Sequence, residues 1–452
     1  MNFQERLLRA IPGGAHTYSR GYDQYPVNAP QILERGKGAY IFNQDGRKFL
    51  DYGMALRAVN LGYAESEIDE AAIKQIRNGN NLTRPSFIEL EAAELLIDLI
   101  DSVDMVKFTK NGSTAVSAAV KLARAFTGRS LVARCAEQPF FSYDDWFISS
   151  TPVTKGIPQE TMGKTKTFRY NDISSLERLI SDFPNKIACV VLEPAATECP
   201  STPSSIDGCC GLAQCARQYR NESSNYLQQV QALCQKNGIV FVLDEMITGF
   251  RWDIKGAQNV YGVTPDLCTF GKAMANGYSL ACVAGRREIM SLGSIEIKGQ
   301  ERVFLLSTTH GSEMSSLGAF VSTVKFMKEH SVISHFWDYG SKLIRMMNQK
   351  AEQYEIGSSF KVEGAACSPF FTTLDHAGSN SLALRTLFSQ EMINNGVLMP
   401  WIALSYRHSE IEFELTERAV GESLKVYAQA LEQGVEKFLV GPPIKPVFRK
   451  YN

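Results

Sequence analysis

The chain lacks a charge excess, a long apolar run and any repetitive segment, and each absence excludes a class of protein. Its 452 residues carry 47 lysines and arginines against 48 aspartates and glutamates, a net charge of −1. No charge excess therefore favours binding to nucleic acid or to an anionic membrane surface. No apolar run approaches the length of a membrane-spanning helix, and we find no internal repeat or low-complexity linker. Hydrophobic residues make up 44% of the chain, enough to bury a large globular core.

The N-terminal residues and the cysteines both indicate a cytoplasmic protein. The opening sequence MNFQERLLRAIPGG is polar and lacks the apolar core of a secretory signal peptide. Ten cysteines are scattered along the chain, and Cys189, Cys268 and Cys282 fall inside apolar runs, as is typical of reduced, buried thiols. We therefore expect cytoplasmic localisation.

The stretch PDLCTFGKAMANG places a lysine directly after a predicted buried strand. Residues 267–270 form a short apolar run bounded by Pro265 and Gly271, so Lys272 lies at the edge of a dry interior. Desolvation favours the neutral amine, which can form an imine with an aldehyde. We interpret Lys272 as a Schiff-base lysine for pyridoxal 5′-phosphate (PLP). A solvated lysine on a surface turn is the alternative that this stretch alone leaves open.

A second predicted strand, upstream, ends in two acids. Residues 239–243 are apolar and mostly β-branched or aromatic, and they run into Asp244 and Glu245. Carboxylates at the C-terminal end of a buried parallel strand lie where open α/β sheets bind their ligands. A carboxylate there can pair with a protonated pyridine nitrogen, whose charge makes the ring an electron sink. We assign this role to Asp244; an aspartate that caps the following turn is the alternative.

The third element is a turn between a predicted strand at 105–109 and a helical pattern from Ala115. Its sequence is KNGST, so free backbone N–H groups, hydroxyls and the helix dipole converge on one spot. Such a turn is typical of an anion site. Ordinary N-capping by Ser113 or Thr114 is the alternative. One chain thus contains a lysine suited to react with an aldehyde, a carboxylate suited to a pyridinium nitrogen and a turn suited to a phosphate. This combination is more specific than any one of the three features.

The order of predicted elements indicates an α/β protein with smaller parts at each end. From about Tyr63 to Glu313, short apolar strands alternate with amphipathic helices, which predicts βαβ units and a mostly parallel sheet. Alternation around Asp45-Gly46 predicts a hairpin before it. After it we predict helices at 317–328, 341–354 and 416–437 and a strand in PFFTTLD. The predicted domains are an N-terminal segment (1–62), a large α/β domain (63–313) and a C-terminal α+β domain (314–452).

Taken together, these stretches resemble the class III, fold type I, PLP-dependent aminotransferases, and most closely their glutamate-1-semialdehyde 2,1-aminomutase branch. The resemblance runs in order from about Ile11 to Glu313 and is weaker through GAACSPFFTTLD to the C-terminus. DEMITGFR followed by TFGK is its most specific part. The other matching stretches are IPGGAHTYSR, GAYIFNQDGRKFLDY, VKFTKNGSTAVSAAVKLARAFTGR, IACVVLEP and STTHGSE. The resemblance implies the fold type I architecture, PLP as cofactor and a homodimer with shared active sites.

The resemblance also assigns residues that hold the cofactor. It implies roles for the following: Lys272 in the Schiff base, Asp244 at the pyridine nitrogen, and Gly112, Ser113 and Thr114 at the phosphate. Thr308 is expected to reach the phosphate of a partner subunit. Phe140 holds the ring-stacking position, where the family usually has Tyr followed by His and Gly, and Met246 is expected on the opposite ring face. Plain core packing is the alternative for both Phe140 and Met246.

Two residues are candidates for binding the substrate. Arg20 matches an arginine that binds the substrate carboxylate in the related aminomutase. A guanidinium can bind a carboxylate through two hydrogen bonds. A solvated arginine is the alternative. Glu193, at the end of the apolar run 187–192, is a candidate for shaping the substrate side.

Departures from the aminomutase pattern predict a different acceptor. A tryptophan of that pattern after DY is replaced here by GMALR, which introduces Arg57. A glutamate of the C-terminal segment corresponds to Leu404, and we expect both positions to face the substrate. Arg57, Tyr406 and His408 are candidate new contacts; a solvated or capping histidine is the alternative for His408.

Residues 199–226 read as an insertion relative to the family. Four cysteines lie in it: Cys199, Cys209, Cys210 and Cys215. Their spacing fits no paired CxxC arrangement and no histidine is near, so we predict no metal site. A surface loop is the interpretation that we favour.

Three functions are compatible with these observations. The first is an aminotransferase that moves an amino group from a small-molecule donor, expected to be glutamate, to an aldehyde or ketone acceptor of secondary or carbohydrate metabolism. The second is an intramolecular aminomutase of the glutamate-1-semialdehyde type. The third is a non-catalytic PLP-fold binding protein, which the combination of Lys272, Asp244 and the phosphate turn disfavours. Whether turnover depends on an added amino donor separates the first two.

Overall fold

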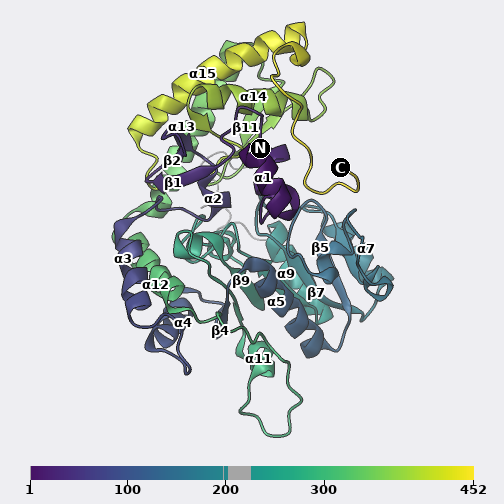
Figure 1. Ribbon diagram of the computed structural model, residues 1–452. Helices are drawn as coiled ribbons and strands as arrows, with labels where there is room; N and C mark the ends of the chain where they lie inside the picture. Colours follow the sequence, from purple (N-terminus) through teal and green to yellow (C-terminus); the bar gives the residue numbers. More distant parts are fainter. Residues whose placement is uncertain (1, 197, 202–224) are drawn as a thin grey trace. The chain divides into compact units, whose positions relative to one another are not determined.

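The computed structural model describes residues 2–196, 198–201 and 225–452 (Figure 1). The chain divides into two compact units: residues 1–65 with 335–452 form unit 1, and residues 66–334 form unit 2. The predicted division into residues 1–62, 63–313 and 314–452 stays a prediction. Within the described residues, no helix combines the length and the apolar character that crossing a membrane would take. Cys209, Cys210 and Cys215 of the predicted insertion lie outside the described residues.

Unit 2 is built on a seven-stranded sheet in the order β4-β10-β9-β8-β7-β5-β6. The bounds are β4 Met105–Thr109, β5 Leu131–Cys135, β6 Thr165–Phe168, β7 Ile187–Leu192, β8 Val240–Asp244, β9 Leu267–Phe270 and β10 Ala281–Gly285. Strands β6, β5, β7, β8 and β9 are parallel to one another, and β10 is antiparallel to both β9 and β4. The predicted α/β fold with a mostly parallel sheet is confirmed.

The central strands are apolar along their whole length because both faces of the sheet are covered. Every residue of β7, β8 and β9 is buried, as expected of a parallel sheet with helices on its faces. Figure 1 shows α5 and α9 running alongside these strands. The helices of unit 2 are α3 Ser66–Arg77, α4 Phe87–Leu99, α5 Gly112–Thr127, α6 Asp145–Ile148, α7 Ile173–Asp182, α9 Tyr226–Asn237, α10 Ala257–Tyr261, α11 Arg287–Met290 and α12 Met314–Glu329.

Unit 1 contains a small four-stranded sheet and most of the C-terminal helices. The predicted hairpin at Asp45-Gly46 is present as antiparallel β2 and β3, and β13 adds a parallel strand beside β3. The four-stranded sheet has the order β1-β2-β3-β13, and β11 and β12 form a separate two-stranded sheet. The strands of unit 1 are β1 Leu33–Lys37, β2 Tyr40–Asn43, β3 Lys48–Asp51, β11 Phe360–Glu363, β12 Phe370–Thr373 and β13 Val397–Leu398. Its helices are α1 Phe3–Ala10, α2 Met54–Arg57, α14 Leu382–Asn394 and α15 Glu410–Gln433, with α13 Val332–Gln353 continuing into it from unit 2.

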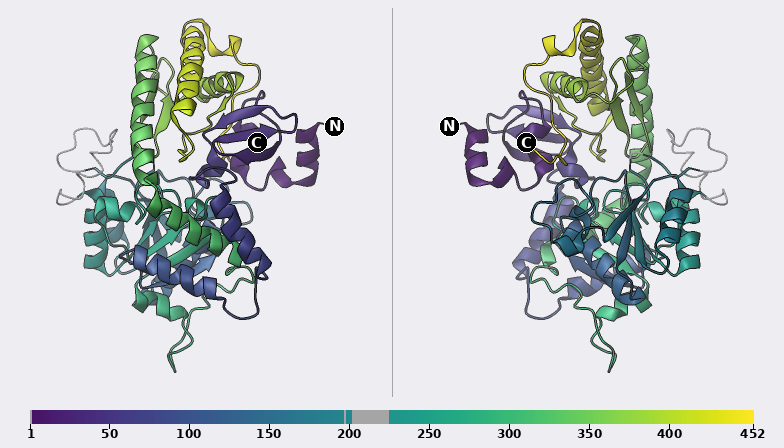
Figure 2. Two further views of the ribbon diagram at one scale, coloured as in Figure 1. Left: turned by 90° about the vertical axis from the view of Figure 1, so that its left-hand side faces the viewer. Right: turned by 90° about the vertical axis from the view of Figure 1, so that its right-hand side faces the viewer.

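The last long helix begins earlier than the apolar pattern predicts. Helix α15 starts at Glu410 because Ser409 and Glu412 form a capping box at its N-terminus, an arrangement that satisfies two free N–H donors. It ends at Gln433 before Gly434, so the prediction of 416–437 is displaced toward the C-terminus at both ends. In Figure 2, α14 and α15 lie side by side in yellow-green and yellow.

A left-handed turn follows β3 in unit 1, at the GMALR sequence that departs from the family pattern. Met54, Ala55, Leu56 and Arg57 have φ values of 40°, 49°, 63° and 67°. Each residue with a Cβ pays about 1–2 kcal/mol in this conformation. Four in succession require strong support from the surrounding structure.

The support comes from a buried carboxylate and a tyrosine hydroxyl. Asp51 accepts hydrogen bonds from the backbone N–H groups of Gly53 and Met54, at 2.7 and 3.0 Å. The Tyr63 hydroxyl donates to Asp51 Oδ2 at 2.7 Å and accepts from the Ala55 N–H at 2.8 Å. Burial raises the pKa of Asp51, and these hydrogen bonds oppose that rise. The turn thus depends on Asp51 and Tyr63.

We predict that Tyr63→Phe destabilises unit 1 by about 1–3 kcal/mol, because it leaves the Asp51 carboxylate and the Ala55 N–H short of a partner. Tyr25→Phe is a matched control: Tyr25 packs against the same core cluster as Tyr63, and its hydroxyl forms no hydrogen bond with a described residue. The midpoint of urea unfolding should fall for Tyr63→Phe and stay close to the parent value for Tyr25→Phe. Equal losses for the two variants would show that the hydroxyl does not support the turn.

Candidate active site

Lys272 follows β9 and starts a short 3-10 helix, Lys272–Ala275 (η5). Its backbone has a φ of 43°, a conformation that non-glycine residues rarely adopt. The side chain is half-buried, while the next three residues are buried. A strained, half-buried lysine at the C-terminal end of a parallel strand is typical of a functional position.

Asp244 ends β8, the strand next to β9. Its carboxylate is buried, and desolvation raises its pKa to about 6. The Met246 N–H, the Lys272 charge and the Thr269 hydroxyl all lower that pKa and so oppose the rise. Both hydrogen bonds fall on Oδ1, from Met246 N at 2.9 Å and Thr269 Oγ1 at 3.2 Å. Among the described residues, Oδ2 accepts no hydrogen bond.

Thr269 is a residue that the sequence interpretation missed. It lies opposite Asp244 in the register of β8 and β9, and its side chain is fully buried. Its hydroxyl orients the carboxylate by donating to Oδ1. A threonine inside an apolar strand was the available signal, since a buried hydroxyl needs a partner.

The predicted phosphate turn forms the N-terminus of α5, a helix of 16 residues. Asn111 is its N-cap: the Asn111 side chain accepts from Thr114 N at 2.9 Å and from Thr114 Oγ1 at 3.0 Å. The alternative in which Ser113 or Thr114 caps the helix is therefore wrong. Ser113 Oγ instead accepts from Tyr143 N at 3.2 Å. Gly112 is the first residue of the helix, where free N–H groups and the helix dipole attract an anion.

Met246 brings the phosphate turn and the lysine turn together. A methyl group at Gly112 would lie 2.8 Å from Met246 Sδ, and one at Gly271 would lie 2.6 Å from the same atom. The Met246 side chain therefore fills the space that a Cβ at either glycine would need. The sequence predicted these pieces separately, and the structure brings Lys272, Asp244 and the start of α5 to one edge of the sheet.

The aromatic stretch after β5 divides into a buried and an exposed part. Phe141 is buried, whereas Phe140 is exposed and meets Phe147 edge-on with ring centroids 5.9 Å apart. Tyr143 is also exposed, and its hydroxyl lies 3.4 Å from Thr114 Oγ1. Tyr143 is thus an aromatic side chain at the phosphate turn that sequence reasoning did not select. The ring-stacking role of Phe140 stays a prediction.

Thr308 is exposed, in a turn held against the end of β4. A methyl group at Gly311 would lie 2.5 Å from Thr308 Oγ1 and 3.2 Å from the Phe108 carbonyl oxygen, so Gly311 allows this close approach. The ion pair between Lys110 Nζ and Glu313 Oε2, at 2.5 Å, ties the same turn to the residue before Asn111. The reach of Thr308 to a partner subunit stays a prediction.

Glu193 follows β7 and is buried. Its backbone N–H donates to Gln138 Oε1 at 2.8 Å, and its carbonyl accepts from Gln138 Nε2 at 2.9 Å. Gln138, another residue that the sequence interpretation missed, therefore fixes the backbone of Glu193. A role for Glu193 on the substrate side stays a prediction.

Arg20 and Arg57 belong to unit 1. Arg20 is exposed, and its charge lowers the pKa of Tyr25 and of Tyr63 against the larger effect of burial. The Arg57 guanidinium lies 5.8 Å from the Trp401 ring centroid. Burial, and to a smaller extent the Arg57 charge, lowers the pKa of Arg385 to about 10. The left-handed turn therefore brings the cations of Arg57 and Arg385 close together.

The C-terminal candidates lie in the interior of unit 1. Leu404 is fully buried, and a methyl group at Gly340 of α13 would lie 3.0 Å from its Cδ1. The expectation that Leu404 faces the substrate stays a prediction. His408 is also fully buried: its Nδ1 accepts from Ser405 N at 3.1 Å, and its ring stacks on Tyr52. The solvated alternative for His408 is wrong.

Residues 22–400 match the family model of the class-III aminotransferases. The chain therefore belongs to that family, and it is a PLP-dependent enzyme. It is 27% identical to a glutamate-1-semialdehyde 2,1-aminomutase of Francisella philomiragia over 92% of this chain and 95% of that protein. It is 28% identical to a 3-aminobutyryl-CoA aminotransferase of Cloacimonas acidaminovorans over 94% of this chain and 96% of that protein.

The fold is shared with a PLP-bound relative. The structure of the FumI protein of Sphingopyxis sp. MTA144 with PLP aligns with a TM-score of 0.81 at 24% identity, over 95% of this chain and 97% of that one. The cofactor of this family is pyridoxal 5′-phosphate, and the residues present fit it: an anion site at the start of α5, an available carboxylate oxygen at Asp244 and the amine of Lys272. When bound, PLP supplies an electron sink for charge that develops on the substrate carbon.

We predict that PLP affinity falls as the pH drops through about 6, because protonation of Asp244 removes the charge that pairs with a cationic ring nitrogen. The Thr269 hydrogen bond lowers the pKa of Asp244, so Thr269→Val should raise it and move the loss of affinity to a higher pH. Spectrophotometric titration with PLP across a pH series measures the midpoint.

Thr248→Val is the matched control for this prediction, because the Thr248 hydroxyl donates to Glu245 and not to Asp244. The midpoint for Thr248→Val should not move upward. The prediction fails if PLP affinity of the parent protein has its midpoint far from pH 6 and Thr269→Val leaves that midpoint unchanged. Asp244 would then not control cofactor affinity.

Proposed function

We propose that the protein is an aminotransferase that moves an amino group from a small-molecule donor, glutamate, to an aldehyde or ketone acceptor. The observation that carries the proposal is the convergence of Lys272, Asp244 and the α5 N-terminus around Met246. These groups supply an amine, a buried carboxylate and an anion site within one edge of the sheet. The aminotransferase and aminomutase relatives support the reaction class.

In this proposal each residue has a task that its position suits. The Gly112, Ser113 and Thr114 end of α5 binds the phosphate through backbone N–H groups and hydroxyls. Asp244, oriented by Thr269, holds a proton on the ring nitrogen through its carboxylate. Nζ of Lys272 accepts the proton from the substrate carbon that carries the amino group and later returns one, as a general base and acid.

The substrate side is proposed from unit 1 and from Glu193. Arg20 binds the substrate carboxylate through its guanidinium, which suits a planar anion. Glu193, with its backbone fixed by Gln138, shapes the site from the end of β7. Arg57 is proposed to set acceptor choice together with Trp401, the ring that it approaches.

We expect the visible absorbance of the PLP-loaded enzyme to change on addition of glutamate, and Lys272→Ala to abolish this change. The exposed Lys236 on α9 provides a matched control, and Lys236→Ala should respond like the parent. Steady-state assays then ask whether turnover of a supplied aldehyde needs an added donor. Turnover without a donor would replace this proposal by an aminomutase, and no bound PLP after reconstitution would contradict the proposal itself.

We further propose that the enzyme is a cytoplasmic homodimer whose subunits share their active sites. Figure 1 shows the segment after α11 extended away from the sheet of unit 2. The large apolar side chains of Ile295, Ile297 and Phe304 in this segment are exposed, and such exposure is typical of a protein interface. The exposed Thr308 follows in the same stretch of chain.

A mixing experiment tests the shared site. Thr308→Ala should lower PLP affinity, and Lys272→Ala should be inactive. Mixing the two variants under conditions that exchange subunits should restore activity, because one site of the mixed dimer then has both side chains. If light scattering shows dimers that exchange and activity does not return, Thr308 does not serve a partner subunit.

A further inference from the structure

The KNGST turn at the start of α5 contains one cation, Lys110, and that cation is engaged. Its Nζ lies 2.5 Å from Glu313 Oε2 and 2.8 Å from Ser316 Oγ. The hydrogen bond from Lys110 also lowers the pKa of Glu313. A phosphate bound at this turn therefore depends on neutral hydrogen-bond donors and on the helix dipole.

The hydroxyl of Thr114, an expected phosphate ligand, is directed toward Asn111. It donates to Asn111 Oδ1 at 3.0 Å, and the Thr114 N–H donates to the same atom at 2.9 Å. A hydroxyl carries a single proton. Thr114 Oγ1 is therefore the acceptor in its other contact, at 3.4 Å, and the Tyr143 hydroxyl is the donor.

The contact with Thr114 is a weak use of the Tyr143 proton. Normal O–H···O hydrogen bonds span about 2.5–3.0 Å, and this one is longer. The Tyr143 side chain is exposed, so its hydroxyl is open to a ligand. A phosphate oxygen is a better acceptor than a threonine hydroxyl, because a hydrogen bond to a charged group is roughly twice as strong as one between neutral groups.

The backbone of Tyr143 is fastened to α5. Tyr143 N donates to Ser113 Oγ at 3.2 Å, and Ser142 Oγ donates to the Ser113 carbonyl oxygen at 3.3 Å. Ser142 Oγ also lies 3.0 Å from Ser117 Oγ, which accepts from Trp146 Nε1 at 2.8 Å. Residues four apart lie on one face of a helix, so the segment is tied to the first turns of α5. A phenol on a fixed backbone loses less entropy when it binds.

Asn111 offers a second side-chain donor at the same helix end. Its Oδ1 accepts both bonds from Thr114, and this fixes the amide orientation because only the carbonyl oxygen can accept. The Nδ2 group then presents two N–H donors, which meet no acceptor among the described residues. Asn111 is exposed, and its amide lies beside the first backbone N–H groups of α5, those of Gly112 and Ser113.

Two acids follow Tyr143 in the chain and oppose an anion at this turn. Asp144 is half-buried and Asp145 is exposed, and both lie at the start of α6. With Lys110 paired to Glu313, the charges around the turn do not favour a phosphate. Neutral donors from side chains are therefore more important here than at a turn with an available cation.

The turn is also fixed against the segment that carries Lys272. Ser279, which follows η5, donates from its Oγ to the Lys110 carbonyl oxygen at 2.7 Å. Together with the approach of Met246 to Gly112, this bond joins the start of α5 to the lysine turn at two points. The donors of Asn111 and Tyr143 thus belong to the same edge of the sheet as the lysine.

We infer that the Tyr143 hydroxyl and the Asn111 amide donate hydrogen bonds to the phosphate of PLP and complete the site that the backbone of α5 begins. The inference rests on the proposed function in that it takes the start of α5 as the phosphate site. It adds two side chains to that site. Thr114 positions the Asn111 amide through its two hydrogen bonds.

Binding of PLP and of pyridoxal, which has the same ring and aldehyde but no phosphate, tests the inference without turnover. The full-length protein freed of cofactor is titrated with each compound and the absorbance change gives the dissociation constant. Tyr143→Phe should weaken PLP binding roughly tenfold, because a hydrogen bond to a charged group is lost. Asn111→Asp should weaken it by roughly tenfold or more, because a carboxylate replaces two donors. Neither variant should change the affinity for pyridoxal, and inorganic phosphate should compete less well with PLP in both.

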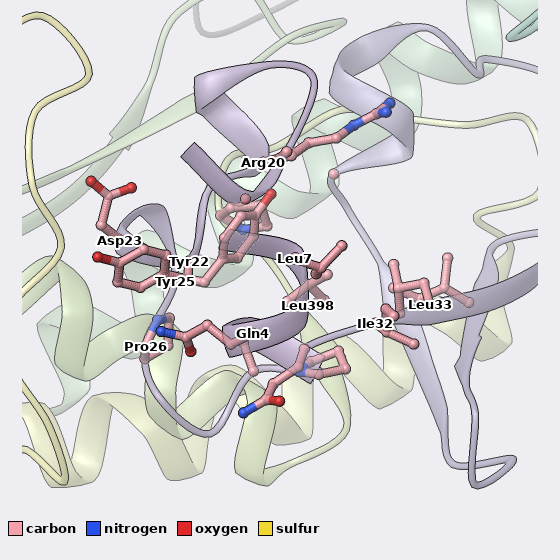
Figure 3. A pocket seen from close by; sticks show the side chains of 18 of the residues that line it. Gln4, Leu7, Arg20, Tyr22, Asp23, Tyr25, Pro26, Ile32, Leu33 and Leu398 are labelled. Atoms are coloured by element: carbon pink, nitrogen blue, oxygen red, sulfur yellow. The ribbon is translucent and has the colours of Figure 1, made fainter. Parts of the chain in front are cut away.

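Each variant has a matched control. Tyr22→Phe controls for Tyr143→Phe: Tyr22 is exposed to 54% against 60% for Tyr143, and its hydroxyl forms no hydrogen bond with a described residue. Tyr22 lines the pocket of unit 1 that Figure 3 shows. Asn2→Asp makes the change of Asn111→Asp at the N-cap of α1, where Asn2 accepts from Glu5 N at 2.9 Å. Aspartate caps a helix as well as asparagine does, so thermal midpoints should stay close to the parent value, and both controls should bind PLP like the parent.

Parent-like PLP affinity in either Tyr143→Phe or Asn111→Asp would overturn the inference. So would an equal loss for PLP and pyridoxal, since a phosphate ligand cannot affect a compound without phosphate. Adding glutamate to the PLP-loaded parent separates the inference from the proposed function. A response to glutamate with parent-like PLP binding in both variants counts against the inference alone, whereas no response with phosphate-specific losses counts against the proposed function alone.

Discussion

The site depends on a close approach at Met246. Its sulfur would lie 2.8 Å from a Cβ at Gly112 and 2.6 Å from a Cβ at Gly271. The start of α5, the residues after β8 and the turn before Lys272 therefore meet at one side chain. Both glycines are needed for steric reasons, and not for a positive φ. This contact joins three segments that are far apart in sequence, since a side chain at either glycine would require Met246 to move.

Burial then sets the charges that this site needs. Desolvation raises the pKa of Asp244 to about 6, and hydrogen bonds from Met246 N and Thr269 limit the rise. Glu245, the next residue, is fully buried, and desolvation raises its pKa to about 7. Its carboxylate accepts from the N–H groups of Ala257 and Gln258 at the start of α10. Two adjacent acids therefore have different partners: Asp244 accepts from Met246 N and Thr269 Oγ1, and Glu245 caps the start of α10.

Unit 1 concentrates its strain where the chain departs from the family pattern. The turn Met54–Arg57 is costly for four residues with side chains, and the Asp51–Tyr63 pair holds it. The turn brings the Arg57 guanidinium within 5.8 Å of the Trp401 ring centroid.

The sequence by itself determined the central sheet, because buried parallel strands are apolar along their whole length and end in recognisable turns. It predicted β7, β8 and β9, and it placed Lys272 and Asp244 directly at the ends of two of these strands. It also predicted the anion turn, although it missed Asn111 as the cap, since several residues in KNGST can accept from a free N–H. Only the tertiary structure decided the close approach of Met246 to Gly112 and Gly271, the hydrogen bond from Thr269 to Asp244 and the left-handed turn. It also decided that Leu404 and His408 are buried. Those features arise from contacts between segments distant in sequence, and local pattern carries no information about such distances.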